Sequence, residues 1–254
     1  MRNLVVFTIL LFLASCSSKP ADLAPVESMQ DEDFNFSTKS DRGSAIANIA
    51  ACGYCHGNNF AGMSSPEDEA EMLAPNITSN TKAFGRFSTF DAINYFRTSN
   101  SHKGLSWAAD EDLQDLIIFL RNVPAKDGNF SSFEIDSSIK ISSVPAPDKH
   151  NKPRFGKYLV DHVARCGVCH TTSGGIFSSK GYLTGSTANI LGNSIEAPSI
   201  VGLSWSTTRW FDYFMGSNEG TETKCPTRFY RKAARVEEGK QMLEAIAEYV
   251  EGLK

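Results

Sequence analysis

The stretches Cys52-Gly53-Tyr54-Cys55-His56 and Cys166-Gly167-Val168-Cys169-His170 share the pattern Cys-x-x-Cys-His. Two thiols three residues apart can form thioethers with the two vinyl groups of a haem, and the next histidine can then coordinate its iron. A single Cys-x-x-Cys could instead be a redox dithiol, and a pair could build a zinc site, but the histidine after each copy favours haem. The pattern therefore predicts two covalent c-type haems, with His56 and His170 as proximal iron ligands.

The first residues have the features of an export signal. Arg2 precedes an apolar run that is too short to span a bilayer comfortably, and residues 1–15 are expected to form a secretory signal peptide. Leu13-Ala14-Ser15-Cys16 resembles a bacterial lipobox, which implies cleavage before Cys16 and lipidation of that residue; the alternative is an ordinary signal peptide that contains a cysteine. Residues 16–39 are polar and acidic and are expected to form a flexible tether.

Localisation follows from these two signals together. Nothing later in the sequence predicts a transmembrane helix, so attachment to a membrane would be through lipid alone. Covalent haem attachment of this kind occurs outside the bacterial cytoplasm, and Ser17 after the lipidated cysteine favours the outer membrane by resemblance. We therefore expect a lipid-anchored protein on the periplasmic side of a bacterial membrane.

The charge balance restricts the class of partner. The chain of 254 residues has a formal net charge of −4, and haem propionates would make its surface more acidic. This argues against nucleic acid as a partner and is compatible with a basic redox protein. The length suits two domains of ordinary size.

An internal repeat supports two domains, because the same landmarks recur in the same order. A short helix with a glycine about ten residues before the first cysteine precedes each Cys-x-x-Cys-His. Each half then has an Ala-Pro-x-Ile segment, a serine-capped helix and a last helix with acidic residues in its first turn. The later landmarks are residues 74–77 and 197–200, residues 87–100 and 205–218, and residues 109–122 and 236–253. Residues 125–152 between the halves are rich in serine and proline and are expected to be a linker.

The repeated unit is similar to the class I cytochrome c domain. The chain resembles a tandem dihaem cytochrome c, such as the cytochrome subunits of bacterial dehydrogenases or the dihaem thiosulfate dehydrogenases, over residues 40–124 and 153–254. The resemblance implies an all-α fold, with three or more helices around each haem. It also implies that the carbonyl groups of Pro75 and Pro198 accept the Nδ1 protons of His56 and His170. A proline that only ends a loop is the alternative.

The distal ligand of the second haem departs from the pattern of these relatives, which usually present methionine followed by proline. Cys225-Pro226 stands at that position, so Cys225 is expected to bind the iron or to lie beside it as a reactive thiol, with its pKa lowered by the iron and by Lys224 and Arg228 if they face the site. The alternatives are Met242 and Met215, which are expected to be a core residue and a helix residue, or an inert buried thiol.

The distal ligand of the first haem is expected to be His102, the only strong ligand in the loop SNSHKGLSW at residues 99–107. Met63, Met72 and an open iron are the alternatives. His150 and His162 are expected to be solvated surface residues.

Two classes of function remain. One is an electron carrier that takes electrons at one haem and passes them through the other to a redox partner protein, such as a dehydrogenase or a terminal oxidase. The other is an enzyme that oxidises a sulfur anion at a cysteine-ligated haem, like a thiosulfate dehydrogenase. Fold does not decide between them, and we favour the carrier.

Overall fold

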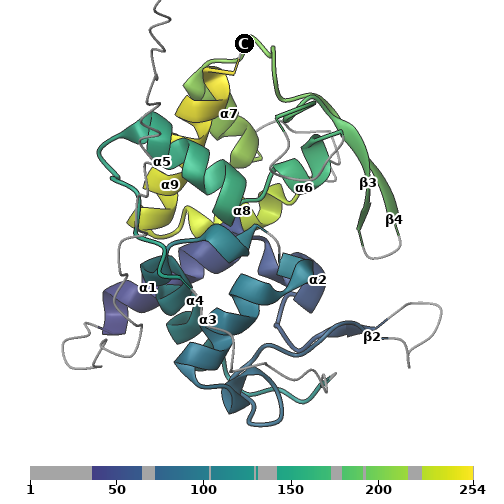
Figure 1. The fold of residues 1–254 in the computed structure, drawn as a ribbon, viewed down its shortest axis with the longest axis vertical. Helices are drawn as coiled ribbons and strands as arrows, with labels where there is room; N and C mark the ends of the chain where they lie inside the picture. Colours follow the sequence, from purple (N-terminus) through teal and green to yellow (C-terminus); the bar gives the residue numbers. More distant parts are fainter. Residues whose placement is uncertain are drawn as a thin grey trace, which may run out of the picture.

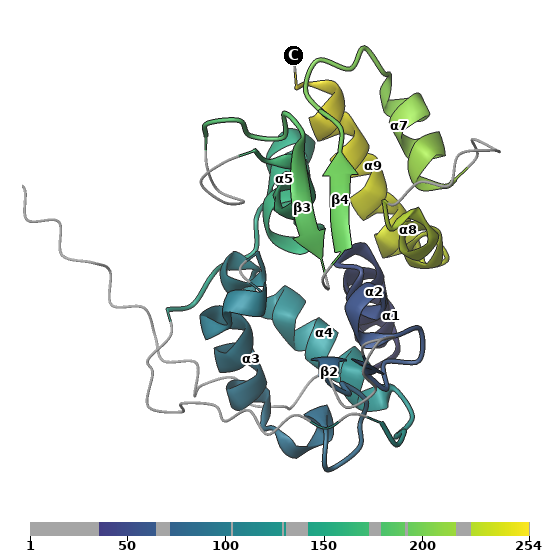
Figure 2. The same cartoon turned by 90° about the vertical axis from the view of Figure 1, so that its right-hand side faces the viewer.

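The two halves of the chain form two groups of helices. The computed structural model describes residues 36–64, 72–102, 104–128, 130, 142–172, 179–190, 193–216 and 225–253. Helices α1 to α4 lie in the lower part of Figure 1 and α5 to α9 in the upper part, and the view turned by 90° in Figure 2 keeps this order. The fold is mostly α, with two short antiparallel hairpins that were not predicted from the sequence.

The elements of the first half follow the expected order. They are α1 (Phe36–Ile49), α2 (Cys52–His56), β1 (Met63–Ser64), β2 (Met72–Ala74), α3 (Thr89–Thr98) and α4 (Asp110–Asn122), with 3₁₀ turns at Phe84–Arg86, Asn100–His102 and Leu105–Trp107. The second half contains α5 (Lys152–Tyr158), a π-helical turn (Leu159–Val163), α6 (Gly167–His170), β3 (Ser186–Ile190), β4 (Asn193–Ala197), α7 (Thr207–Phe214), α8 (Thr227–Ala233) and α9 (Glu237–Glu251). Helix α8 was also not predicted.

The helix starts agree with the local sequence signals. Ser88 accepts a hydrogen bond from the backbone of Asp91 and forms a capping box at the start of α3, and Ser206 caps α7 in the same way through Arg209 N–H. Acidic residues occupy the first turns of α4 and α9, where they oppose the positive end of the helix dipole. The helices expected at 87–100, 205–218, 109–122 and 236–253 are therefore present with slightly shorter bounds.

The first and last helices of each half cross closely. Helix α1 packs against α4, and α5 packs against α9. A Cβ atom added to Gly43 would lie 2.0 Å from the carbonyl oxygen of Asp115, and one added to Gly156 would lie 2.1 Å from that of Ala245. The glycine that precedes each Cys-x-x-Cys-His motif is thus needed because the backbone of the last helix passes directly beside it.

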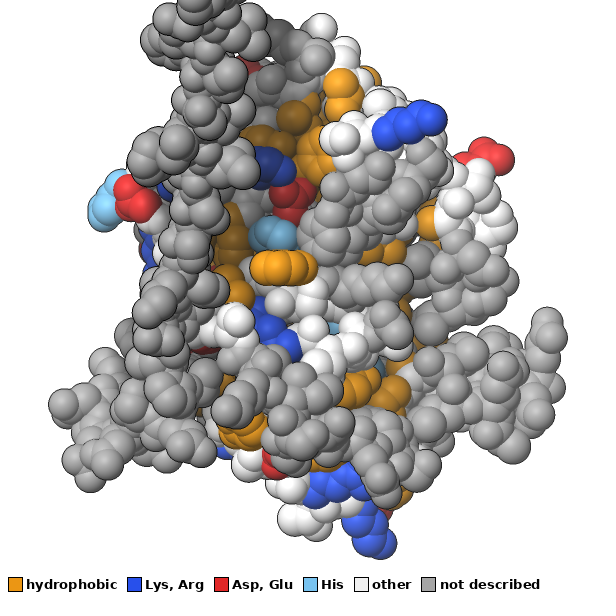
Figure 3. All heavy atoms as spheres, in the orientation of Figure 1, with side chains coloured by type: hydrophobic (Ala, Val, Ile, Leu, Met, Phe, Trp, Pro, Cys, Tyr) orange, Lys and Arg blue, Asp and Glu red, His pale blue; other side chains and the backbone are white. Residues whose placement is uncertain are grey.

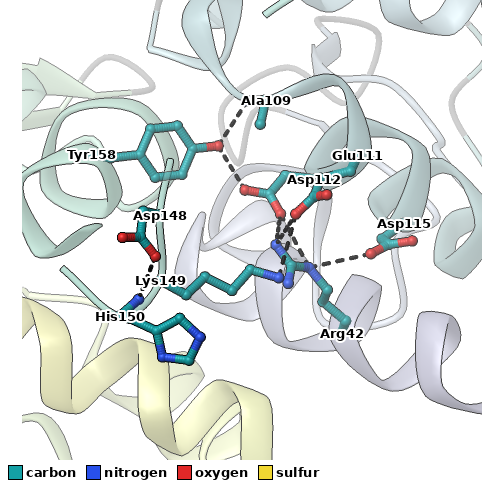
Figure 4. Close-up of polar contacts among 9 residues, drawn as sticks. All are labelled: Arg42, Ala109, Glu111, Asp112, Asp115, Asp148, Lys149, His150 and Tyr158. Atoms are coloured by element: carbon teal, nitrogen blue, oxygen red, sulfur yellow. Dashed lines mark hydrogen bonds and ion pairs between the residues drawn. The ribbon is translucent and has the colours of Figure 1, made fainter. Parts of the chain in front are cut away.

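Contacts between the halves join helices that are distant in sequence. Helix α1 packs against α8 and α9 as well as α4. The hydroxyl of Tyr158 donates to Asp112 at 2.6 Å and accepts from Ala109 N–H at 2.7 Å. Asp112 in turn binds the guanidinium of Arg42, as Figure 4 shows. The phenol of Tyr158 in the second half is therefore part of a buried polar cluster that belongs to the first half.

The boundaries of the tether and linker differ from those expected. Helix α1 begins at Phe36, although the tether was expected to extend to residue 39. The expected signal peptide at residues 1–15, Cys16 and the rest of the expected tether lie outside the described residues. Helix α5 begins at Lys152, the last residue of the linker expected at 125–152. Within that range, Lys126 O accepts from Asn76 Nδ2 at 2.8 Å, and the backbone N–H of Val144 donates to Asp110 at 3.2 Å.

Hydrophobic side chains also reach the surface. Several apolar patches are visible on the face seen in Figure 3, and Trp107 is 59% exposed. Within the parts of the chain that the structure describes, no helix has the length and hydropathy needed to cross a membrane.

Candidate functional site

Both Cys-x-x-Cys-His motifs begin after the same backbone turn. Ala51 and Arg165, which directly precede the first cysteine of each motif, have a left-handed φ of 53°. The chain then enters the short helices α2 and α6, which carry the motif residues except Cys166, the N-cap of α6. All the described cysteines are free thiols. The repeat therefore extends from the sequence to an uncommon backbone conformation.

Each motif histidine makes the hydrogen bond expected from the resemblance. Nδ1 of His56 lies 2.7 Å from the carbonyl oxygen of Pro75, and Nδ1 of His170 lies 2.7 Å from that of Pro198. Because a carbonyl oxygen only accepts, each ring carries its proton on Nδ1 and keeps the lone pair on Nε2. Burial lowers the pKa of His56 and of His170, while these two bonds oppose the change. Both histidines thus leave a neutral Nε2 lone pair available, which is the form that a metal ligand needs.

The loops that carry the prolines are held in the same way in both halves. Gly62 N–H donates to His56 O at 3.0 Å, and Gly185 N–H donates to His170 O at 2.8 Å. Both glycines have positive φ and lie directly against the proline segment, so that a Cβ on either would lie within 3.0 Å of its backbone. The paired strands follow at once, with Met63 opposite Ala74 and Ser186 opposite Ala197. The unpredicted hairpins therefore position the proline carbonyl groups.

His102 lies opposite His56 in the first site. Their ring centres are 6.2 Å apart and their planes differ by 10°. Two imidazoles bound to one iron from opposite sides have ring centres roughly 6 Å apart, because each metal–nitrogen bond is about 2 Å long. The separation of His56 and His102 fits that arrangement and is too large for direct ring stacking.

The surroundings of His102 fix its ring. Tyr95 and Phe96 both lie with ring centres 5.6 Å from it, and Ser99 Oγ is 3.3 Å from its Nδ1. Burial, followed by the charge of Arg165 and by His56, lowers the pKa of His102 to about 3. His102 is thus held as a neutral base, as a metal ligand must be.

The other candidates for the first site are less well placed, or lie outside the description. Met63 is in β1, near the end of α2: a Cβ on Gly57 would be 3.6 Å from its Cγ. The side chain of Met72 lies outside the described residues. His150 is exposed, as expected. His162 was expected to be a solvated surface residue, but it is half-buried: it packs against Tyr158 with ring centres 5.6 Å apart and donates to the backbone of Gly104.

Cys225 lies beside the second motif. It precedes α8, packs on the hydrophobic core and is close enough to Cys166 and Cys169 for their charges to interact. Burial raises the pKa of Cys225 to about 12, although a hydrogen bond with Tyr213 opposes this. The guanidinium of Arg228 instead lies 4.8 Å above the ring of Phe229, and Lys224 lies outside the described residues. The protein groups described here therefore keep Cys225 protonated, and Arg228 does not supply the lowering that was expected.

The alternatives to Cys225 occupy the positions expected for them. Met242 is buried in α9 at 2% exposure and belongs to the core. Met215 directly follows α7 as its C-cap residue, with helical backbone angles.

The donor groups fit two haems better than a cluster of protein ligands. No three described His, Cys, Asp or Glu side chains lie close enough together to hold a metal ion. A haem iron needs at most two protein ligands, because the porphyrin supplies the other four. Nε of Arg165 and Nε1 of Trp210 are buried without a hydrogen-bond partner among the described residues. A bound group with acceptor oxygens would satisfy such donors, since buried N–H groups are normally paired.

The sequence did not single out Arg165, Trp210 or Tyr213. Arg165 could have been noticed because the repeat aligns it with Ala51, so that a charge stands where the first half has a methyl group. Comparison with protein-family models and with curated proteins gives no match for this chain. The assignment of the sites therefore depends on these residues and their geometry.

Proposed function

We propose that this protein is a dihaem c-type cytochrome made of two tandem class I cytochrome c domains. One haem would be attached through Cys52 and Cys55 and the other through Cys166 and Cys169. The observation that carries the proposal is the repeated bond from the motif histidine to a proline carbonyl, at 2.7 Å in both halves. A free Cys-x-x-Cys dithiol has no need of a neighbouring histidine that presents Nε2.

The proposed iron ligands of the first site are His56 and His102. The separation of 6.2 Å between their ring centres supports this pair over Met63. Bis-histidine ligation would give this haem a low reduction potential.

The proposed iron ligands of the second site are His170 and Cys225. The support is the position of Cys225 beside Cys166 and Cys169, together with its hydrogen bond to Tyr213. A bond to iron would make the thiolate the stable form, even though burial alone favours the thiol.

The function supported best is electron transfer. Haem iron supplies a reversible one-electron change, and the two motifs are close enough for Cys55 and Cys169 to interact electrostatically. Such proximity favours electron exchange between the two sites. We propose that the protein works at the periplasmic side of a bacterial membrane, anchored by lipid at Cys16, with the outer membrane favoured. Its partner would be a redox protein such as a dehydrogenase or a terminal oxidase.

A second candidate is oxidation of a sulfur anion, as in thiosulfate dehydrogenases. The observation that favours it is the difference between the sites, because only the second has a cysteine as its candidate distal ligand. It remains the weaker proposal because one cysteine does not define a substrate site.

The test begins with the cofactor. Electrospray mass of the purified protein should exceed the polypeptide mass by two haems, and the reduced spectrum should show a c-type Soret band. An unmodified mass would disprove the proposal. The oxidised protein should then be mixed with thiosulfate and, separately, with a reduced cytochrome c. If reduced cytochrome c reduces the protein fast and thiosulfate does not, the result supports an electron carrier. Reduction by thiosulfate at a catalytic rate supports an enzyme.

A further inference from the structure

Arg165 belongs to the second half but lies within the first site. Its Nη2 donates to the carbonyl oxygen of Ala50, just before the first motif, at 3.1 Å. On the distal side, a Cβ added to Gly104 would lie 2.2 Å from Cγ and 2.4 Å from Cδ of Arg165. Gly104 follows His102 by two residues. The arginine side chain therefore runs between the segment that leads to the proximal histidine and the loop that carries the candidate distal one.

The charge of Arg165 is not neutralised by any described carboxylate. No ion pair involves it among the described residues, and its buried Nε has no hydrogen-bond partner there. By contrast, Arg42 binds Asp112, Asp115 and Glu111, and Arg97 binds Asp110. Arg165 is half-buried, and a charge that is partly shielded from water and has no described carboxylate partner exerts a stronger field on its neighbours than an exposed one, because the effective dielectric constant is lower there.

This field acts on the two sites unequally. The positive charge of Arg165 interacts with both histidines of the first site, His56 and His102, and with Cys52 and Cys55. In the second site it interacts with Cys169, whereas the groups that act on His170 do not include it.

We propose that the charge of Arg165 raises the reduction potential of the first haem site. In the one-electron-reduced protein, the electron would therefore occupy the first haem more often than it would without this charge. This inference rests on the proposed function. Transfer of one electron from the second haem to the first would reduce the first and oxidise the second, and the cation beside the first site would stabilise the negative charge added there. Bis-histidine ligation alone would give the first site a low reduction potential and make it a poor electron acceptor. The charge of Arg165 opposes this effect. The second half of the chain thus contributes a charged side chain, that of Arg165, to the first site.

The test is a redox titration of Arg165→Gln, followed optically and by electron paramagnetic resonance (EPR), which separates the two haems. Loss of the charge should lower the equilibrium constant for electron transfer from the second haem to the first by about tenfold. For one electron this is a shift of about 59 mV. Arg165→Lys should retain most of the wild-type value. Arg154→Gln, which removes an exposed arginine of the same half, is the matched control and should change nothing.

A purely structural role would give a different pattern. Arg165→Gln and Arg165→Lys would then both lower the thermal stability without moving either potential, and that result would overturn the proposal. If Arg165→Gln does not fold, Gly104→Ala provides the second test, because its Cβ displaces the arginine while keeping its charge. The first potential should again fall, with the bis-histidine EPR signal retained; an unchanged potential rejects the tuning role. A chain that binds no haem at all would refute the proposed function instead.

Discussion

The two sites share their proximal side and differ on their distal side. In both halves a left-handed residue, a short helix and a glycine-supported hairpin bring the motif histidine within 2.7 Å of a proline carbonyl. On the other side, the first site presents His102 among aromatic rings, and the second presents Cys225 beside Tyr213. In the proposed cytochrome, the repeated frame would provide the attachment of each haem, and the segment between the serine-capped helix and the last helix would supply its distal ligand. The variants that follow either eliminate one of the two proposed haem sites or measure how the sites differ in distal ligand and reduction potential.

The largest effect is expected from removing the attachment cysteines. The double variant Cys52→Ala with Cys55→Ala should lose one haem from the mass spectrum and keep the second site. Its counterpart, Cys166→Ala with Cys169→Ala, should keep the first haem. If either pair leaves both haems attached, the two-site model is wrong.

His102→Ala should open the first iron on its distal side. Near-parallel imidazole planes favour a rhombic low-spin EPR signal in the oxidised protein, and the variant should replace it with a high-spin one. His150→Ala changes an exposed histidine and serves as the control. If His102→Ala keeps the low-spin signal, the distal ligand of the first iron is another residue.

Cys225→Ala should affect only the second site. A thiolate-type low-spin signal should disappear, and the potential of the second haem should rise, because a strong electron donor has been lost. Tyr213→Phe should shift the potential of the second haem in the opposite direction and by less, because loss of the hydrogen bond leaves the thiolate a stronger electron donor. An unchanged spectrum in Cys225→Ala means that the thiol is inert.

The smallest effect concerns the contact between the halves. Tyr158→Phe leaves Ala109 N–H and Asp112 without this partner, and the free energy of unfolding should fall by about 1–3 kcal/mol. Burial and Asp112 raise the pKa of Tyr158, so the unfolded state loses this proton first as the pH rises above about 10. The stability contributed by the neutral phenol is therefore present below that pH and is lost as the pH rises above it. The free energy of unfolding of Tyr158→Phe should consequently fall less steeply with rising pH than that of the wild type.

Denaturant unfolding with Lys152→Gln as the exposed control measures the effect of Tyr158→Phe. A variant as stable as the wild type at pH 7 would show that the contact contributes nothing.

The sequence predicted the proximal side better than the rest of the molecule. Motif spacing, the glycines at 43 and 156 and the serine caps are local or repeated signals, and the expected helices formed around them. The hairpins could not be seen, because strands such as Met63–Ser64 are too short for alternation to register. Helix α8 had a signal in the helical spacing of Phe229, Tyr230 and Ala233, all of which are buried.

The positions of His162 and Arg165 could not be predicted, because both depend on contacts between the halves. His162 lies in the π-helical turn before the second motif and donates to the backbone of Gly104 in the first half. Arg165 reaches Ala50 and Gly104 only after the two halves have docked. Patterns within one half contain no information on either contact.

The packing of α8 on the first motif has a consequence for biosynthesis. A Cβ on Gly53 would lie 2.7 Å from the ring of Phe229, so the finished fold closes over the turn between Cys52 and Cys55. Phe229 is synthesised long after that turn, and in the proposed exported protein it would also leave the translocation channel later. An export-linked enzyme that joins porphyrin to these thiols would therefore have to act while the C-terminal portion is still absent or unfolded. The order of emergence from the channel would then help to ensure that the first prosthetic group is installed before its access route is lost.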